Sequence, residues 1–299
     1  MVSNLEGSII SDFLFLVSVA LALNGSGSFL AWRREYLRTD GAIAAFTVGM
    51  ILFLLTPIAW IVLLVFFISS SLLSKVKRDT SPTKVKAQAM FEKGGKRDVS
   101  QVLANSLAGI LFLLVLIPEG GNPNLVSAPM IAYVGAIGAA TADTWATEIG
   151  TMAPSARWVL NPRRTVPVGT SGGISLLGTL AAFLGSIALT LSFFICLIIQ
   201  IELTGNTAPS MEKSAIILLI GSVAGLIGSF VDSFLGATVQ AFYFCPSCRH
   251  GTEKKVHTKC GGTETNLTRG YTFINNDLVN FLATASAGLT AFVGFVLVV

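Results

Sequence analysis

Long apolar runs separated by short polar segments dominate the chain. Eight of them lie near residues 8–23, 41–56, 57–73, 101–118, 128–147, 172–201, 214–239 and 278–298. As helices, runs of this kind span about 30 Å of hydrocarbon. The second and third are short and meet at Thr56-Pro57, so a re-entrant pair is an alternative for them. The pattern predicts an all-α, polytopic membrane bundle of about eight transmembrane helices, forming a single domain over residues 1–299.

Composition supports a membrane protein. The mean hydropathy is +0.73, 53% of the residues are hydrophobic and 12% are charged. Soluble domains carry about a quarter charged residues, so this chain does not fit that class. The first run is interpreted as a retained helix rather than a signal peptide, because no basic segment precedes it.

Charge placement predicts the orientation. Every Lys and Arg except Lys213 falls in a loop that follows an odd-numbered run. The positive-inside rule then places these loops in the cytosol, including a basic loop at 74–100 and a Cys/His-containing loop at 241–277. The pattern does not distinguish an endomembrane from a bacterial plasma membrane. Nucleic acid is not expected as a partner, because the cations flank helices without an interleaved aromatic platform.

Two carboxylates lie near the predicted cytosolic ends of the fifth and seventh runs. These residues, Asp143 and Asp232, are costly in membrane helices, where a negative charge near the C-terminus also opposes the helix dipole. Mg²⁺, which prefers oxygen ligands, would compensate them. The alternative is hydrogen bonding to neighbouring helices or pairing with Arg163 or Arg164. The sequences around the two acids are similar, which is compatible with internal repeats.

A glycine-rich segment precedes the sixth run and follows Arg163-Arg164. Free N–H groups at a helix start favour a phosphate, and glycines let the backbone approach it closely. The segment is therefore a candidate phosphate site, although it also fits an ordinary cap and turn. Its residues are Gly169, Thr170, Ser171, Gly172 and Gly173.

Further polar residues begin the fourth and eighth runs. Asn276, Asp277 and Asn280 share one helix face, so we expect them to face the site, with Asp277 as a third metal ligand or only a cap. Lys96 and Arg97 follow two glycines and are candidate substrate contacts. The alternative for this basic segment is a solvated surface near anionic lipid.

Glu148 follows Asp143 by five positions, which is about 140° around a helix. The two acids therefore do not share a face of a regular helix. Glu148 is expected to serve the following loop, with an arginine as its partner.

Three of the four cysteines lie in the 241–277 loop. Cys245, Cys248, His257 and Cys260 have the spacing of a compact zinc knuckle. Disulfides are disfavoured in the cytosol, and thiolates suit Zn²⁺ better than Mg²⁺. An incidental apolar role and redox chemistry are alternatives, and His250 is a rival ligand.

Four motifs resemble those of the transmembrane protein 19 family, which includes a phytyl-phosphate kinase of plants and cyanobacteria. They are Ala-Asp143-Thr-Trp-Ala-Thr-Glu148-Ile-Gly, Pro162-Arg163-Arg164-x-Val-Pro-x-Gly169-Thr-x-Gly172-Gly173, Asp232-Ser-x-x-Gly-Ala-Thr and Asn276-Asp277-x-Val-Asn280. The resemblance covers most of the chain from about residue 24. It implies a kinase that converts an isoprenoid monophosphate to the diphosphate with a nucleoside triphosphate, CTP or ATP.

Within that chemistry, each group of candidate residues has an expected role. Asp143 and Asp232, with Asp277, would hold Mg²⁺; Arg163 and Arg164 would neutralise the transferring phosphoryl group; and the Gly169–Gly173 amides would cradle a phosphate. The isoprenyl chain would lie among the helices beside membrane lipids. The alternatives are a secondary transporter of an anionic or lipid-phosphate substrate, whose site would lie near the midplane, and a lipid-binding scaffold.

Overall fold

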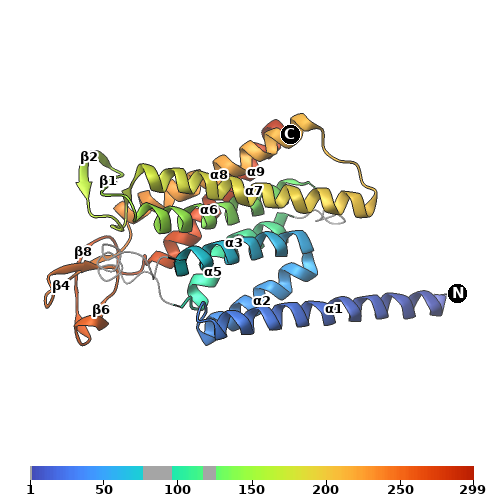
Figure 1. Ribbon diagram of the computed structural model, residues 1–299, viewed down its shortest axis with the longest axis horizontal. Coiled ribbons are helices and arrows are strands. Elements are labelled where there is room, and N and C mark those ends of the chain that lie inside the picture. Colours follow the sequence, from blue (N-terminus) through green and yellow to red (C-terminus); the bar gives the residue numbers. More distant parts are fainter. Residues whose placement is uncertain (1, 77–95, 117–125) are drawn as a thin grey trace.

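The computed structural model describes residues 2–76, 96–116 and 126–299. About 70% of it is helical, and the described residues form eight α-helices (Figure 1). Each helix coincides with one predicted apolar run. They are α1 (Val2–Arg33), α2 (Thr39–Leu55), α3 (Pro57–Val76), α5 (Val99–Leu116), α6 (Ala128–Gly150), α7 (Leu176–Thr204), α8 (Met211–Thr238) and α9 (Asn276–Val298).

Five of the helices in the described residues are long and apolar enough to cross a membrane. They are α3, α7, α8, α9 and most of α1, whereas the apolar parts of α2 and α5 are shorter. The helical membrane architecture is therefore confirmed, and the number of eight crossings stays a prediction. Helices α2 and α3 are separated at Thr56, whose extended backbone precedes Pro57.

Helix α6 is the centre of the bundle. It packs against α3, α5, α7, α8 and α9, and its residues from Pro129 to Ala142 are buried. Small side chains permit this close packing. A Cβ atom at Gly225 of α8 would lie 2.9 Å from the backbone of Gly138, and one at Gly135 would lie 2.6 Å from Ala291 of α9.

Helix α1 is longer than the run at 8–23 that predicted it. The Asn24-Gly-Ser-Gly-Ser segment resembles a turn but continues the helix. Asn24 is buried, and its side-chain oxygen accepts a 2.9 Å hydrogen bond from the indole N–H of Trp60 on α3. The side-chain oxygen of this buried residue therefore has a hydrogen-bond partner inside the bundle.

Small sheets gather at the end of the bundle opposite both termini (Figure 1). One sheet has the order β2-β1-β3, a second has the order β5-β4-β8, and β6 pairs with β7, all antiparallel. The strands are β1 (Ala156–Trp158), β2 (Asn161–Val166), β3 (Gly173–Ile174), β4 (Phe242–Cys245), β5 (His250–Thr252), β6 (Val256–His257), β7 (Thr263–Glu264) and β8 (Asn266–Arg269). The all-α prediction missed them, because they are too short to produce a clear alternating pattern.

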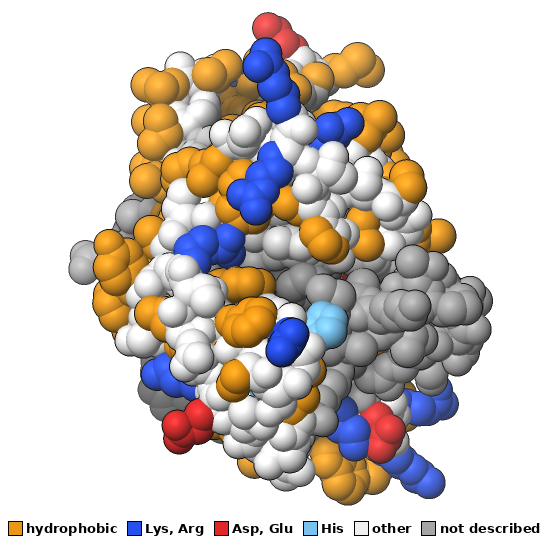
Figure 2. All heavy atoms as spheres, turned by 90° about the vertical axis from the view of Figure 1, so that its left-hand side faces the viewer, with side chains coloured by type: hydrophobic (Ala, Val, Ile, Leu, Met, Phe, Trp, Pro, Cys, Tyr) orange, Lys and Arg blue, Asp and Glu red, His pale blue; other side chains and the backbone are white. Residues whose placement is uncertain are grey.

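Basic side chains are spread over this end. Figure 2 looks onto it and shows more Lys and Arg side chains than acidic ones. The loops that follow α1, α6 and α8 all lie here, as the charge pattern predicts (Figure 1). Which side of a membrane this end faces stays a prediction.

Candidate functional site

A polar cavity of about 80 Å³ lies where the C-terminal parts of α6 and α8 meet the start of α7. We call it the polar cavity. It brings together Asp143, Asp232 and the Gly169–Gly173 segment, which sequence reasoning had assigned to one site. Its polar and backbone lining includes Asp143, Thr147, Gly169, Thr170, Ser171, Gly172, Gly173, Ser175, Ser229, Asp232 and Ser233.

Helical spacing explains how hydroxyl groups accompany the two acids. Thr147 follows Asp143 by one turn, and Ser229 precedes Asp232 by three positions, so each lies on the same face as its acid. Thr147 and Ser229 were not among the residues predicted from the sequence, although the same helical spacing indicates them. Both acids are half-buried.

The glycine-rich segment lies between strand β2 and helix α7 and lines the polar cavity. Gly172 has φ of 86°, and a Cβ atom there would lie 2.5 Å from that of Ala237 on α8, so this position requires glycine. The N–H of Gly173 donates to the carbonyl of Thr170 at 2.8 Å, and the N–H of Thr170 donates to the carbonyl of Pro167 at 3.2 Å. These two amides are used inside turns.

The segment does not form the N-terminus of the following helix. Helix α7 begins at Leu176, and the hydroxyl of Ser175 caps it by accepting from the N–H of Gly178 at 3.0 Å. The segment precedes the helix, as expected, but the cap of the helix is Ser175. Thr170 and Gly173 form turns, and all five residues of the segment line the polar cavity.

Arg163 and Arg164 lie on the exposed strand β2, outside the cavity lining. The guanidinium of Arg164 is 5.8 Å from the ring of Trp158 on β1. Because Trp158 pairs with Gly173, the hairpin that carries both arginines is attached to the glycine-rich segment. The two arginines are exposed on a hairpin that is joined to one wall of the cavity.

Arg269, at the end of β8, is a half-buried cation that the sequence analysis counted only as a loop charge. Its Nη2 atom donates to the carbonyl oxygen of Gly236 at 2.8 Å and lies 3.5 Å from that of Ser171. Its guanidinium lies 4.9 Å from the ring of Trp158. Burial lowers the pKa of Arg269 from its usual value. No local motif marks this residue, since its neighbours come from three distant segments.

The polar residues at the start of α9 lie elsewhere. Among the described residues that line the polar cavity, Asn276, Asp277 and Asn280 are absent. Asp277 interacts electrostatically with Asp98 and Glu253. The cap of α9 is Asn275, whose side chain accepts from the N–H of Leu278 at 2.9 Å. Asp277 is outside the lining of the polar cavity, and its role as a third metal ligand stays a prediction.

Glu148 faces away from the polar cavity, as its spacing from Asp143 predicts. Its Oε1 atom accepts a 3.0 Å hydrogen bond from the hydroxyl of Ser74 on α3. It also interacts electrostatically with Arg97. The expected arginine partner therefore comes from the segment before α5.

A second cavity, of about 300 Å³, lies between α1, α2, α3 and the start of α5. We call it the apolar cavity, because aliphatic and aromatic side chains form most of its wall. Its lining includes Leu30, Ala45, Val48, Leu63, Leu64, Phe66, Phe67, Ile68 and Leu72. Its polar lining includes Arg34, Ser71, Arg97, Gln101 and Asn105.

Arg97 is the half-buried cation of the apolar cavity. Its guanidinium lies 5.5 Å and 5.7 Å from the rings of Phe66 and Phe67. Burial lowers the pKa of Arg97 to about 10, and the charge of Glu148 partly opposes this effect. Lys96, in contrast, is exposed, and its Nζ atom lies 2.8 Å from Oε1 of Glu35. Gly94 and Gly95, which precede them, lie outside the described residues.

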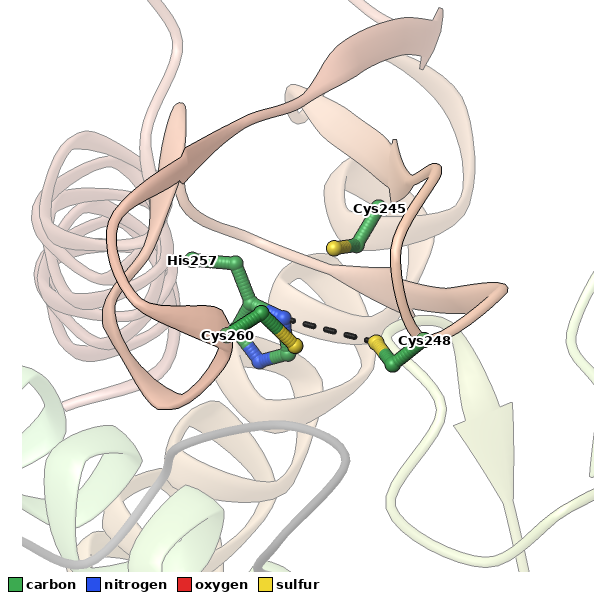
Figure 3. Close-up of side chains that lie close together, drawn as sticks. All are labelled: Cys245, Cys248, His257 and Cys260. Carbon is green, nitrogen blue, oxygen red and sulfur yellow. Dashed lines mark hydrogen bonds between the residues drawn. The ribbon is translucent and has the colours of Figure 1, made fainter.

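The loop after α8 gathers three thiols and an imidazole. We call this group the Cys/His cluster; it consists of Cys245, Cys248, His257 and Cys260 (Figure 3). One ligand atom from each residue lies within 4.8 Å of all the others. His250, the rival ligand, is exposed, and its Nδ1 atom hydrogen bonds to the carbonyl oxygen of Cys248. Hydrogen bonds, the largest from the backbone N–H of Cys248 and others from Ser247 and His257, lower the pKa of the Cys245 thiol to about 6.

Comparison with known proteins places the chain in a family. Residues 22–288 match the family described as integral membrane protein DUF92. The chain is 30% identical to Protein PGR of Arabidopsis thaliana over 90% of its own length and 92% of that protein. It is 26% identical to the chloroplastic Protein VTE6 of the same plant, over 85% of this chain and 64% of that protein.

An uncharacterized membrane protein of Methanocaldococcus jannaschii is 32% identical over 68% of this chain and 75% of its own length. No solved structure matches the chain. The family resemblance drawn from the sequence motifs is confirmed: the chain belongs to the integral membrane protein family DUF92.

Proposed function

We propose that the protein is a membrane kinase that transfers a phosphoryl group from a nucleoside triphosphate to an isoprenoid monophosphate. The observation that carries the proposal is the polar cavity, where Asp143, Asp232 and the Gly169–Gly173 segment meet. Such a constellation suits phosphate and a divalent cation. The family resemblance implies the same chemistry.

The polar cavity fits Mg²⁺ by its donor chemistry. Asp143 and Asp232 offer carboxylate oxygens, and Thr147, Ser229 and Ser233 surround them with hydroxyls. Mg²⁺ is held by one or two carboxylates, waters and substrate phosphates, so no third acid is needed. When bound, it would neutralise charge on the phosphate oxygens during transfer.

Cavity size indicates where the nucleotide would lie. About 80 Å³ is far below the roughly 300 Å³ at which ligand pockets begin, so only a phosphate group and its cation fit inside. The rest of the nucleotide would lie over the exposed hairpin of β1 and β2. There Arg163 and Arg164 would bind its phosphates, and Trp158 offers an aromatic face.

The apolar cavity suits the isoprenoid acceptor. Its volume of about 300 Å³ and its aliphatic and aromatic wall match a hydrocarbon chain, and Arg34 and Arg97 supply positive charge for the phosphate. The half-buried position of Arg97 strengthens its interaction with an anion, because water screens it less. A single-chain lipid phosphate therefore fits this cavity with its hydrocarbon chain against the apolar wall and its phosphate beside the arginines.

The reaction needs positioning rather than a strong base. An anionic oxygen of the lipid phosphate attacks the γ-phosphorus of the nucleotide, and the bond between that phosphorus and the β,γ-bridging oxygen breaks. The nucleoside diphosphate leaves with the electron pair, and the lipid gains a P–O–P linkage. Because the acceptor oxygen is already anionic, the chain has to align the two phosphates and neutralise their charge.

The test is phosphoryl transfer by the full-length protein in detergent. The assay contains Mg²⁺, γ-labelled ATP or CTP, and phytyl, geranylgeranyl or farnesyl monophosphate. We expect a labelled lipid diphosphate, and we expect Asp143→Asn to lower the rate by about 10²-fold or more. Glu202→Gln is the matched control, because Glu202 is exposed at the other end of α7.

Full kinase activity in Asp143→Asn would overturn the role of the polar cavity in the reaction. Nucleotide-independent uptake of a lipid phosphate or another anion into proteoliposomes, dependent on Asp143 and without any kinase activity, is a second result, and it would overturn the kinase itself. That second result would favour the transporter.

A further inference from the structure

The Cys/His cluster lies outside both cavities and takes no part in the proposed phosphoryl transfer. Its ligand atoms lie within 4.8 Å of one another, and the Sγ atom of Cys248 lies 3.5 Å from Nδ1 of His257. Figure 3 shows the four side chains pointing toward a common centre. Cys245 and His257 are buried, and Cys248 and Cys260 are half-buried.

We propose that this cluster is a structural zinc site. Three thiolates and one imidazole form a closed tetrahedral shell for one Zn²⁺ ion. The ligands are Cys245, Cys248, His257 and Cys260.

The distances are close to those that zinc requires. With Zn–S bonds of about 2.3 Å, tetrahedral geometry places neighbouring sulfur atoms about 3.8 Å apart. The 4.8 Å spread of the cluster contracts to this value by small side-chain movements. Sulfur ligands favour Zn²⁺ over Mg²⁺, so the cluster is chemically distinct from the polar cavity. With four protein ligands, no position stays open for a substrate.

The ligands come from two separate hairpins. Cys245 and Cys248 belong to the turn between β4 and β5, and His257 and Cys260 lie on β6 and the short 3₁₀ helix after it. A two-residue pairing such as β6 with β7 is marginal by itself. A shared metal would join the two hairpins and supply the stability that their small contact area lacks.

The first hairpin has the turn that a metal knuckle needs. The N–H of Arg249 donates to the carbonyl of Cys245 at 2.9 Å, which closes the turn around the two thiols. Arg249 has φ of 56°, a left-handed conformation that is unfavourable for a residue with a Cβ atom. A bound metal would help to keep the turn in this conformation.

The zinc site would also fix the position of a cationic side chain, Arg269, beside the polar cavity. Strand β4 ends at Cys245, and its first residue, Phe242, pairs with Arg269 at the end of β8. Arg269 donates to the carbonyl oxygen of Gly236 and stacks on Trp158. Zinc would therefore keep Arg269 against the glycine-rich segment, as a positioning element rather than a catalytic one.

Metal analysis of the full-length protein tests the proposal directly. The protein is purified in detergent with a tag that contains no histidine and under reducing conditions, and its zinc is measured by mass spectrometry. We expect about one zinc per chain. Cys248→Ser and His257→Ala should lose it, whereas Cys196→Ser and His250→Ala, matched controls outside the cluster, should keep it.

Cobalt substitution covers the case in which the cluster variants fail to fold. Co²⁺ added to the metal-depleted wild-type protein should produce the visible absorption of a tetrahedral thiolate site, and Zn²⁺ should abolish it. Metal depletion should also increase tryptic cleavage at Lys254 and Lys255. Wild-type protein that contains no zinc and binds neither ion would overturn the proposal, as would equal zinc loss in His250→Ala. These measurements do not depend on kinase activity.

Discussion

The polar and apolar cavities differ in size, wall and charge. The polar cavity is about 80 Å³ and carries two carboxylates, hydroxyls and a glycine-rich backbone. The apolar cavity is about 300 Å³ and is lined mainly by aliphatic and aromatic side chains, with arginines among its few polar residues. Their linings share no residue. A divalent cation with phosphate suits the first, and a hydrocarbon chain with an anionic head suits the second.

Helix α6 links the two regions. Asp143 lines the polar cavity, while Glu148 bonds to Ser74 and interacts with Arg97, which lines the apolar cavity. The rotation of about 140° between the two acids sends them to different sides of one helix. Helix α6 therefore lines the polar cavity directly through Asp143, whereas Glu148 is connected to the apolar cavity only through its interaction with Arg97.

The largest effect should come from Asp232→Asn. Loss of this carboxylate should lower kcat by about 10²–10³-fold, because charge neutralisation at the phosphates is lost. Binding of the lipid phosphate should be unchanged, since Asp232 lies in the polar cavity only. Steady-state kinetics and a separate lipid-binding assay check this, with Glu212→Gln at the other end of α8 as the control. Weaker lipid binding in Asp232→Asn would break the separation of the two cavities.

Arg97→Gln should affect binding of the lipid and not of the nucleotide. Removing a charged hydrogen bond worth about 1.5–3 kcal/mol should weaken lipid-phosphate binding by about 10- to 100-fold. Nucleotide binding should not change. Binding of labelled geranylgeranyl monophosphate checks the effect, and Lys96→Gln, which removes an exposed neighbouring charge, is the control.

The pKa of Arg97 predicts that lipid-phosphate affinity depends on pH. Arg97 is charged below its pKa of about 10 and neutral above it. Lipid-phosphate affinity should therefore be constant at neutral pH and fall as the pH rises through about 10. In Arg97→Gln this fall should disappear, and a fall that persists there would contradict the assignment.

A side chain that fills the apolar cavity should act on the lipid alone. Ala45 lines the cavity, and Ala45→Trp should raise the KM for geranylgeranyl monophosphate by about tenfold, the loss expected for about 1.4 kcal/mol. Ile43→Trp on the same helix is the control, because Ile43 is 63% exposed and outside the lining. An equal effect of both variants would show that packing, not the cavity, is responsible.

The smallest effect is expected from Arg164→Gln. This exposed side chain interacts with phosphate through water-screened charge worth about 0–1 kcal/mol, so the KM for the nucleotide should rise by about fivefold at most. The rise should shrink at high salt. Kinetics at two salt concentrations check it, and a large change in the lipid KM would place Arg164 beside the other substrate.

The sequence predicted the helices well, because the hydropathy of a segment does not depend on which other segments it packs against. It also predicted that Asp143 and Asp232 meet the Gly169–Gly173 segment, since charge placement located all three at one end. It does not decide whether Asp277 joins them, because the direction in which a helix start faces depends on packing. The position of Arg269 was not predicted, because its neighbours come from three separate segments of the chain. No sequence pattern indicated the apolar cavity, since apolar residues like those of its lining occur on every membrane helix.

The most direct measurement is the transfer of label from the γ-position of a nucleoside triphosphate to geranylgeranyl monophosphate. The account predicts a labelled diphosphate with the wild-type protein, a lowered kcat in Asp143→Asn and a raised lipid KM in Ala45→Trp. Absence of any lipid diphosphate from folded wild-type protein, with Mg²⁺ and either ATP or CTP, would contradict it.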